Sequence, residues 1–379
     1  MGGLKNKNDE KKGKRMNDKD IKKLAGAIKA SSSHRRIWYR FDDEPTIIEA
    51  KAGYAEVWRG AARLVFACES EFSARTVEGD YLASVLKAGM PRAIDADGDN
   101  LHIEDADGVK HTLATKDATL PPTVAPAGIP VRLDIPALRK VFKKIEPFAS
   151  TDETRSVICC LRLRARGGQL LATATDSYRL VLDYPLPNVT EPEGFEELLL
   201  PAAAVKLLLA CLPTGHNPAV LYPDGTLGAL GDGWGLQLKN TRQEGYPNVE
   251  RVVPEEYKYS MYLYNPQAVA KKLAAACKSL GVRRTNSTDF RLTLPLDSQE
   301  ETTLYVEHRG EERKLNIPII LAGKRPGVGQ MQYNPQFFLD ALALVDDHDD
   351  TVEIGLNAPN GPTKIGPSVL MPIPTSHWD

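Results

Sequence analysis

The sequence predicts an α+β protein of three similar domains, each with two helices packed on antiparallel sheets. Two observations lead to this fold class: a helical pattern that returns at a regular interval, and period-two segments between its copies. The chain has 379 residues, which is more than one compact core usually holds. Several domains are therefore expected.

The helical pattern opens four times with an extended apolar residue, a proline and an apolar stripe. Proline suits the first turn of a helix, where its missing N–H would have no intrahelical partner. The four prolines are Pro136, Pro201, Pro266 and Pro335. Their intervals of 65, 65 and 69 residues are too regular for chance. Two weaker copies, from Asp18 and Glu78, precede them, so six related units are predicted.

Period-two segments between the helices predict hairpins, with turns at Gly167-Gly168, Asp224-Gly225 and Arg309-Gly310. One helix with its strands has two faces to cover, so the units should pair. Proline-rich connectors near 119–130 and 246–256 place the domains at 16–127, 128–254 and 255–379. Residues 1–15 hold six basic and two acidic side chains and are expected to be a disordered basic leader.

Composition excludes several classes of protein. No apolar run approaches the roughly 20 residues of a membrane span, so a cytoplasmic protein without a membrane partner is expected. The five cysteines include no C-x-x-C pair, which favours core residues over disulfides or zinc. We expect no metal and no cofactor, and the acidic run at 346–350 is interpreted as a solvated loop.

Basic residues recur on the first helix of each predicted domain and on the loop after it. In 134–145, an apolar stripe of Leu138, Val141, Phe142 and Ile145 lies opposite a basic face. One such face usually means only solvation, but three equivalent faces favour binding to a phosphate backbone without sequence readout. The candidate DNA-binding residues are Lys22, Lys23, Lys29, Arg35, Arg36, Arg139, Lys140, Lys143, Lys144, Arg155, Lys271, Lys272, Lys278, Arg283 and Arg284.

Three segments resemble the bacterial DNA polymerase III beta subunit, the sliding clamp: LLATATDSYRLVLDYP at 170–185, EGYPNVERVVP at 244–254 and SVLMPIP at 368–374. The resemblance is strong over 131–255, fair at both ends of the third domain and weak in the first. It implies the DNA-clamp fold, closed into a ring as a head-to-tail homodimer around double-stranded DNA. It also implies a processivity factor without catalytic activity, whose partners are a DNA polymerase and an ATP-dependent clamp loader.

The resemblance further implies a partner-peptide groove between the second and third domains, in which apolar residues take peptide anchors and Arg and Thr hold polar groups. Its residues would be Ile158, Thr175, Ser177, Tyr178, Arg179, Leu180, Pro247, Arg251, Val252, Val369, Met371, Pro372 and Ile373. This chain departs from the family at Ser177 and Tyr178, where glycine and histidine are usual, and at Glu250, where arginine is usual. Trp378 in the terminal TSHWD is hypothesised to occupy the groove of its own chain.

Two other functions stay open. One is a clamp-like ring or monomer of phage or plasmid type, which binds DNA or proteins without supporting the host polymerase. The other is a nucleotide-processing enzyme that uses the polar stretch 175–179. The enzyme has little support, because the chain contains no phosphate loop, no H-E-x-x-H and no G-x-S-x-G.

Overall fold

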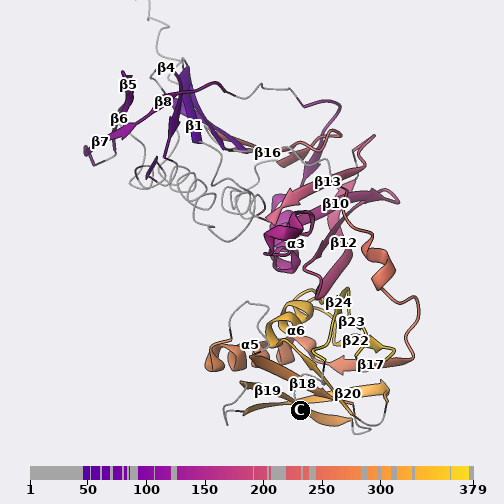
Figure 1. Cartoon of the computed structure of the whole chain (residues 1–379). Helices are drawn as coiled ribbons and strands as arrows, with labels where there is room; N and C mark the ends of the chain where they lie inside the picture. Colours follow the sequence, from indigo (N-terminus) through magenta and orange to yellow (C-terminus); the bar gives the residue numbers. More distant parts are fainter. Residues whose placement is uncertain are drawn as a thin grey trace, which may run out of the picture. The chain divides into compact units, whose positions relative to one another are not determined.

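A computed structural model describes residues 46–120 and 126–374, with internal gaps (Figure 1). The gaps are 52, 60–61, 69–70, 79–80, 83–84, 86–92, 106, 191, 203–204, 206–218, 232–233, 239–244, 283–288, 297–299, 309–313, 327–328 and 359. Several predicted features therefore lie outside the described residues. They are the basic leader, the helix from Asp18, Trp378, and the candidate DNA-binding residues Lys22, Lys23, Lys29, Arg35, Arg36, Arg283 and Arg284.

The chain packs as two compact units. The first consists of Met1–Phe142, Leu163–Leu170 and Leu186–Glu244, and the second of Lys143–Arg162, Leu171–Pro185 and Gly245–Asp379. The boundaries of the three predicted domains stay a prediction.

The first unit contains a nine-stranded antiparallel sheet in the order β8-β4-β1-β2-β3-β16-β15-β14-β9. Its strands are β1 (Thr46–Lys51), β2 (Gly53–Arg59), β3 (Ala62–Cys68), β4 (Phe72–Val77), β8 (Lys116–Asp117), β9 (Val131–Leu133), β14 (Ala219–Leu221), β15 (Leu227–Gly231) and β16 (Trp234–Leu238). A smaller sheet holds β5 (Ala93–Asp97), β6 (Asn100–Glu104) and β7 (Lys110–Ala114). Strand β3 pairs with β16, so strands from the first two predicted domains form one sheet.

Helix α3 (Ile135–Ile145) begins one residue before Pro136, close to the predicted position. Its apolar stripe is confirmed, because Leu138, Val141, Phe142 and Ile145 are all buried. Two short 3-10 helices follow, η1 (Glu146–Phe148) and η2 (Glu153–Cys159). They lead into β10 (Cys160–Arg166), which lies beside β13 (Glu197–Pro201).

The second unit is built on an antiparallel sheet in the order β11-β12-β24-β23-β22-β17-β20-β19-β18-β21. The strands are β11 (Gln169–Thr175), β12 (Arg179–Thr190), β17 (Tyr259–Tyr264), β18 (Phe290–Pro295), β19 (Glu301–His308), β20 (Lys314–Lys324), β21 (Gln330–Tyr333), β22 (Thr351–Leu356), β23 (Thr363–Ile365) and β24 (Ser368–Leu370). A 3-10 helix, η3 (Val249–Val252), precedes β17.

Two helices, α5 (Pro266–Leu280) and α6 (Pro335–Leu342), pack against each other and against this sheet (Figure 1). Both begin at the predicted prolines. Leu273 and Phe338 are fully buried in one core with strand residues such as Leu321. Two helices on antiparallel strands are the predicted arrangement of a domain, and here that prediction is confirmed.

The predicted hairpins are also confirmed. Gly167 and Gly168, with φ of 62° and 80°, form the two-residue turn between β10 and β11, where a side chain would be strained. Gly225 has φ of 78° in the turn between β14 and β15. Strands β19 and β20 pair from Glu301 to Glu307, although the turn itself lies outside the described residues. None of the helices in the described parts of the chain is long and apolar enough to cross a membrane.

Candidate functional site

The loop between β11 and β12 is held by its own side chains. Thr175 Oγ1 donates to the carbonyl of Arg179 at 2.7 Å and accepts from the N–H of Ser177 at 3.2 Å. One oxygen of Asp176 accepts from the N–H groups of Tyr178 and Arg179, both at 3.0 Å. A loop lacks the backbone hydrogen bonds that join neighbouring strands. These side-chain bonds take their place, so the loop has a defined shape.

Ser177 lies at the point of this loop with φ of 77°, in the left-handed region that costs a non-glycine residue about 1–2 kcal/mol. The family that the sequence resembles usually has glycine at this position. The positive φ is the physical reason, because glycine adopts it without strain. Serine gains a bond that glycine cannot make, because Arg155 Nη1 donates to its Oγ at 2.8 Å. Arg155, a candidate DNA-binding residue, thus lies beside the loop.

Arg179 is buried beneath the loop, and each of its three side-chain nitrogens donates a hydrogen bond. Its Nε donates to Asp176 at 2.9 Å, its Nη1 to Asp340 at 2.6 Å and its Nη2 to the carbonyl of Pro147. The guanidinium lies 4.0 Å from the ring centroid of Phe337. Burial raises the pKa of Asp176, and the charge of Arg179 opposes that rise. Arg179 and Thr175 therefore shape the surface from below, with their polar groups bonded inside the protein.

The second element of the site is η3, which is fixed by a buried cation. Arg162 Nη2 donates to Glu250 Oε1 at 3.2 Å, and its guanidinium lies 5.0 Å from the ring centroid of Tyr246. Arg162 is buried and Glu250 is partly exposed. The acidic residue at 250, where the family usually has arginine, is thus matched by a basic residue on β10.

The third element is β24, whose Leu370 and Val369 pair with Arg179 and Leu180 of β12. Leu180, Val249 and Val369 form a small buried cluster, so one residue each from β12, η3 and β24 meets there. The N–H of Met371 donates to the carbonyl of Tyr178 at 2.7 Å, which joins the segment after β24 to the loop.

Three large apolar residues that lie within two positions of β12, η3 or β24 in the sequence, or inside them, remain exposed: Tyr178 at 52%, Val252 at 56% and Met371 at 42%. We call these three residues, together with the cluster of Leu180, Val249 and Val369, the partner surface. Exposed apolar side chains gathered in one place usually mark an interaction site.

The other predicted groove residues are divided between surface and interior. Pro247 and Arg251 are exposed, whereas Ile158, Pro372 and Ile373 are buried. The N–H of Ile373 donates to the carbonyl of Gln332 at 2.7 Å, which fixes the end of the described chain.

The basic residues of α3 and α5 differ in exposure. Lys140 and Lys143 are exposed, whereas Arg139 and Lys144 are partly buried, and Lys144 Nζ lies 3.5 Å from the carbonyl of Val345. The basic residues of α5 are all exposed: Lys271, Lys272 and Lys278. Each helix thus presents basic side chains on the face opposite its buried stripe.

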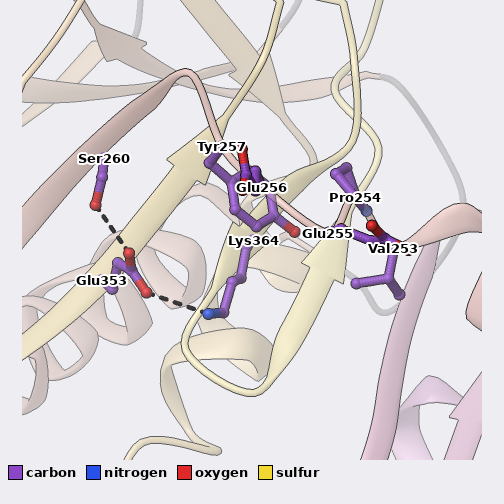
Figure 2. Close-up of a pocket in the computed structure, with 8 residues that line it drawn as sticks. All are labelled: Val253, Pro254, Glu255, Glu256, Tyr257, Ser260, Glu353 and Lys364. Carbon is purple, nitrogen blue, oxygen red and sulfur yellow. Dashed lines mark hydrogen bonds and ion pairs between the residues drawn. The ribbon is translucent and has the colours of Figure 1, made fainter.

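A pocket of about 470 Å³ adjoins the partner surface, and sequence reasoning missed it (Figure 2). Its lining includes Val253, Tyr257, Ser260, Glu353 and Lys364, and Val253 also packs against the apolar cluster of the partner surface. These residues come from separate strands and a connector, so they form no sequence motif that would predict the pocket.

Glu353 is the most connected polar group in this pocket. Its Oε1 accepts from Ser260 Oγ at 2.8 Å and its Oε2 from Lys364 Nζ at 3.1 Å (Figure 2). These hydrogen bonds, first that from Ser260, lower the pKa of Glu353 below its ordinary value. Within the described parts of the chain, no group of three His, Cys, Asp or Glu side chains is arranged to hold a metal.

Comparison with known proteins gives a consistent result. No family model matches the chain. A beta sliding clamp of Lactococcus lactis is 21% identical over 219 residues, which cover 58% of this chain and 56% of the relative. The chain thus matches little more than half the length of this curated relative.

Solved structures match over almost the whole chain. A DNA polymerase III beta subunit of Thermotoga maritima aligns with a TM-score of 0.68 and 17% identity, covering 95% of this chain and 98% of the other. A Helicobacter pylori beta clamp bound to a DNA ligase peptide aligns with a TM-score of 0.64 and 18% identity, covering 95% and 99%.

The fold of this chain is therefore the DNA-clamp fold. Together with the sequence matches, these structures support the assignment of this chain as a divergent member of the bacterial sliding-clamp family, the DNA polymerase III beta subunits.

Proposed function

We propose that the protein is a sliding clamp that encircles duplex DNA as a head-to-tail homodimer and tethers a DNA polymerase through the partner surface. The observation that carries this proposal is the convergence of β12, η3 and β24 on one small buried apolar cluster, with Tyr178, Val252 and Met371 exposed on the adjoining residues. These are the same three segments in which the sequence resembles the family.

Tethering needs no chemistry of its own. A ring around DNA keeps a bound polymerase at high effective concentration on its template, so it acts by topology. Basic side chains on α3 and α5 would contact phosphates without reading bases, which lets the ring move along the duplex. A clamp loader that uses ATP would open the ring, and this step would take place in the cytoplasm, on the nucleoid.

The decisive experiment is retention on DNA. The full-length protein is incubated with nicked circular plasmid, a clamp loader and ATP, and then separated from free protein by gel filtration. Protein that co-elutes with the circle and is released when a restriction enzyme linearises it has encircled the DNA. Equal retention on circular and linear plasmid would contradict the ring, as would a monomeric mass at micromolar concentration.

An alternative keeps the clamp but changes its partner. Tyr178 on the partner surface, and Glu250 on η3 with its partner Arg162, differ from the family, which favours a protein that does not serve the host polymerase. A primer-extension assay with the host polymerase separates the two: a retained ring that fails to lengthen the products supports the alternative.

A further inference from the structure

The pocket beside the partner surface has an excess of negative charge. Glu255 and Glu256 are exposed on its rim, and Glu353 lies inside, against the single positive charge of Lys364. Glu353 uses one lone pair on each oxygen for Ser260 and Lys364. Each carboxylate oxygen has a second lone pair, so Glu353 can still accept hydrogen bonds.

Tyr257 contributes to the wall of the pocket. Its hydroxyl is buried and has no hydrogen-bond partner among the described residues. Its ring lies directly on β22, because a Cβ built on Gly355 would be 2.7 Å from the ring. The pocket therefore combines carboxylate acceptors, the side chain of Tyr257 and the apolar side chains of Val253 and Pro254.

A guanidinium on an aliphatic stem fits this combination. Its five N–H donors spread over a plane and can reach separate acceptors, whereas an ammonium is a compact point charge. The stem would lie against the apolar wall. A cavity needs about 10–15 Å³ on the same measure to hold one water, so about 470 Å³ has room for a side chain and several waters.

Val253 connects the pocket to the partner surface, because it lines the first and packs against the cluster of the second. We propose that the pocket binds the arginine side chain of a partner segment whose apolar residues cover the partner surface. This inference rests on the proposed function, since it names the chemistry of the partner that the same surface would take.

The test uses a minimal probe, N-acetyl-arginine methylamide, with the citrulline analogue as an uncharged control of nearly the same shape. Full-length protein with labelled tyrosine rings is titrated by NMR, and the Tyr257 signal is assigned with Tyr257→Phe. We expect a saturable shift of that signal with arginine, and binding about tenfold weaker with citrulline, which corresponds to 1.4 kcal/mol. Equal responses to the two probes would overturn the proposal.

Variants locate the site. Glu353→Gln, and separately the double change Glu255→Gln with Glu256→Gln, should each weaken arginine binding, while Glu301→Gln, an exposed residue of β19, should leave it unchanged. Circular dichroism checks that each variant is folded. Unchanged binding in both pocket variants would show that arginine binds elsewhere.

The pH dependence gives an independent readout. Because the pKa of Glu353 is lowered from 4.5, its carboxylate stays charged at mildly acidic pH. Arginine binding should therefore persist at mildly acidic pH and weaken only at lower pH, where the carboxylates of the pocket become protonated. A loss centred near pH 6 to 7 would contradict a site made of these carboxylates, since histidine titrates there.

A peptide experiment separates this inference from the proposed function. The DNA ligase peptide from the Helicobacter pylori complex is titrated into the wild type and into Met371→Ala. If the wild type binds arginine but no such peptide, the proposed partner surface fails and the pocket stands. If the wild type binds the peptide but not arginine, the pocket proposal alone is overturned.

Discussion

Arg179 shows how one residue can hold the candidate site together. Its guanidinium joins the β11–β12 loop to η1 through the carbonyl of Pro147, and to α6 through Asp340. Phe148 and Phe337 lie near it, at 5.0 and 4.0 Å from their ring centroids. Removing such a partner leaves buried carboxylates without compensation, which costs more than the pair itself contributes.

We therefore expect Arg179→Met to lower the free energy of unfolding by about 3–5 kcal/mol. Arg251→Met, at an exposed position of η3, is the matched control and should change it by less than about 0.5 kcal/mol. Urea denaturation followed by circular dichroism measures both. Similar small changes in the two variants would mean that the buried guanidinium is dispensable.

Two buried tyrosine hydroxyls make a second comparison. Tyr333 donates to Thr363 Oγ1 at 2.9 Å, and Thr363 is fully buried, whereas the hydroxyl of Tyr257 has no partner among the described residues. Tyr333→Phe should destabilise the protein by about 1–3 kcal/mol, because it leaves the Thr363 hydroxyl with one partner fewer. Tyr257→Phe should leave the stability of the protein unchanged. Thermal unfolding of the two variants compares them directly, and an equal loss in both would reveal a partner for Tyr257.

At the scale of elements, the repeated tetrapeptide YNPQ begins two helices in different ways. Asn334 precedes α6 with extended backbone, and its side chain accepts from the N–H groups of Gln336 and Phe337. Asn265 precedes α5 with φ of 51° and makes no capping bond, while its own N–H donates to the carbonyl of Asp350 at 2.8 Å. The chain entering α5 from β17 thus takes a left-handed turn that the chain entering α6 does not.

The two asparagines should therefore respond differently to substitution. Asn334→Ala removes a helix cap and is expected to cost about 1 kcal/mol. Asn265→Gly should be neutral or slightly stabilising, because glycine adopts a positive φ without strain. Chemical denaturation measures both, and a loss of about 1 kcal/mol or more in Asn265→Gly would show that its side chain contributes a contact.

At the scale of the whole molecule, the charge distribution matters more than its sum. The formal net charge is −2, yet α3 and α5 carry exposed lysines and no carboxylates. If these lysines contact duplex DNA as proposed, binding releases counterions and the affinity falls steeply with salt.

Replacing Lys140, Lys143, Lys271 and Lys272 with glutamine should weaken binding to unrelated duplexes alike. The slope of log affinity against log salt should flatten by about 0.9 for each phosphate that the variant no longer neutralises. Lys110 and Lys116, exposed on β7 and β8, provide a matched control pair. Fluorescence anisotropy over a range of salt concentrations gives both slopes, and an unchanged slope in the helix variant would place the DNA elsewhere.

The amino-acid pattern by itself determined the elements of this protein. Proline entries set the starts of α5 and α6, Gly167 and Gly168 set a two-residue turn, and the apolar spacing in 135–145 set the buried face of α3. These features depend on residues a few positions apart, where backbone geometry links sequence to structure directly. The clamp fold and the three segments of the partner surface came instead from the resemblance of 170–185, 244–254 and 368–374 to a known family.

Only the tertiary structure decided what the polar residues of the site do. Arg179 meets Asp340 across 161 positions of sequence, and Arg162 meets Glu250 across 88. The pocket formed by Tyr257, Glu353 and its neighbours draws on segments just as far apart. Whether a charge is buried, paired or exposed depends on which distant residues surround it, and no local period or spacing carries that information.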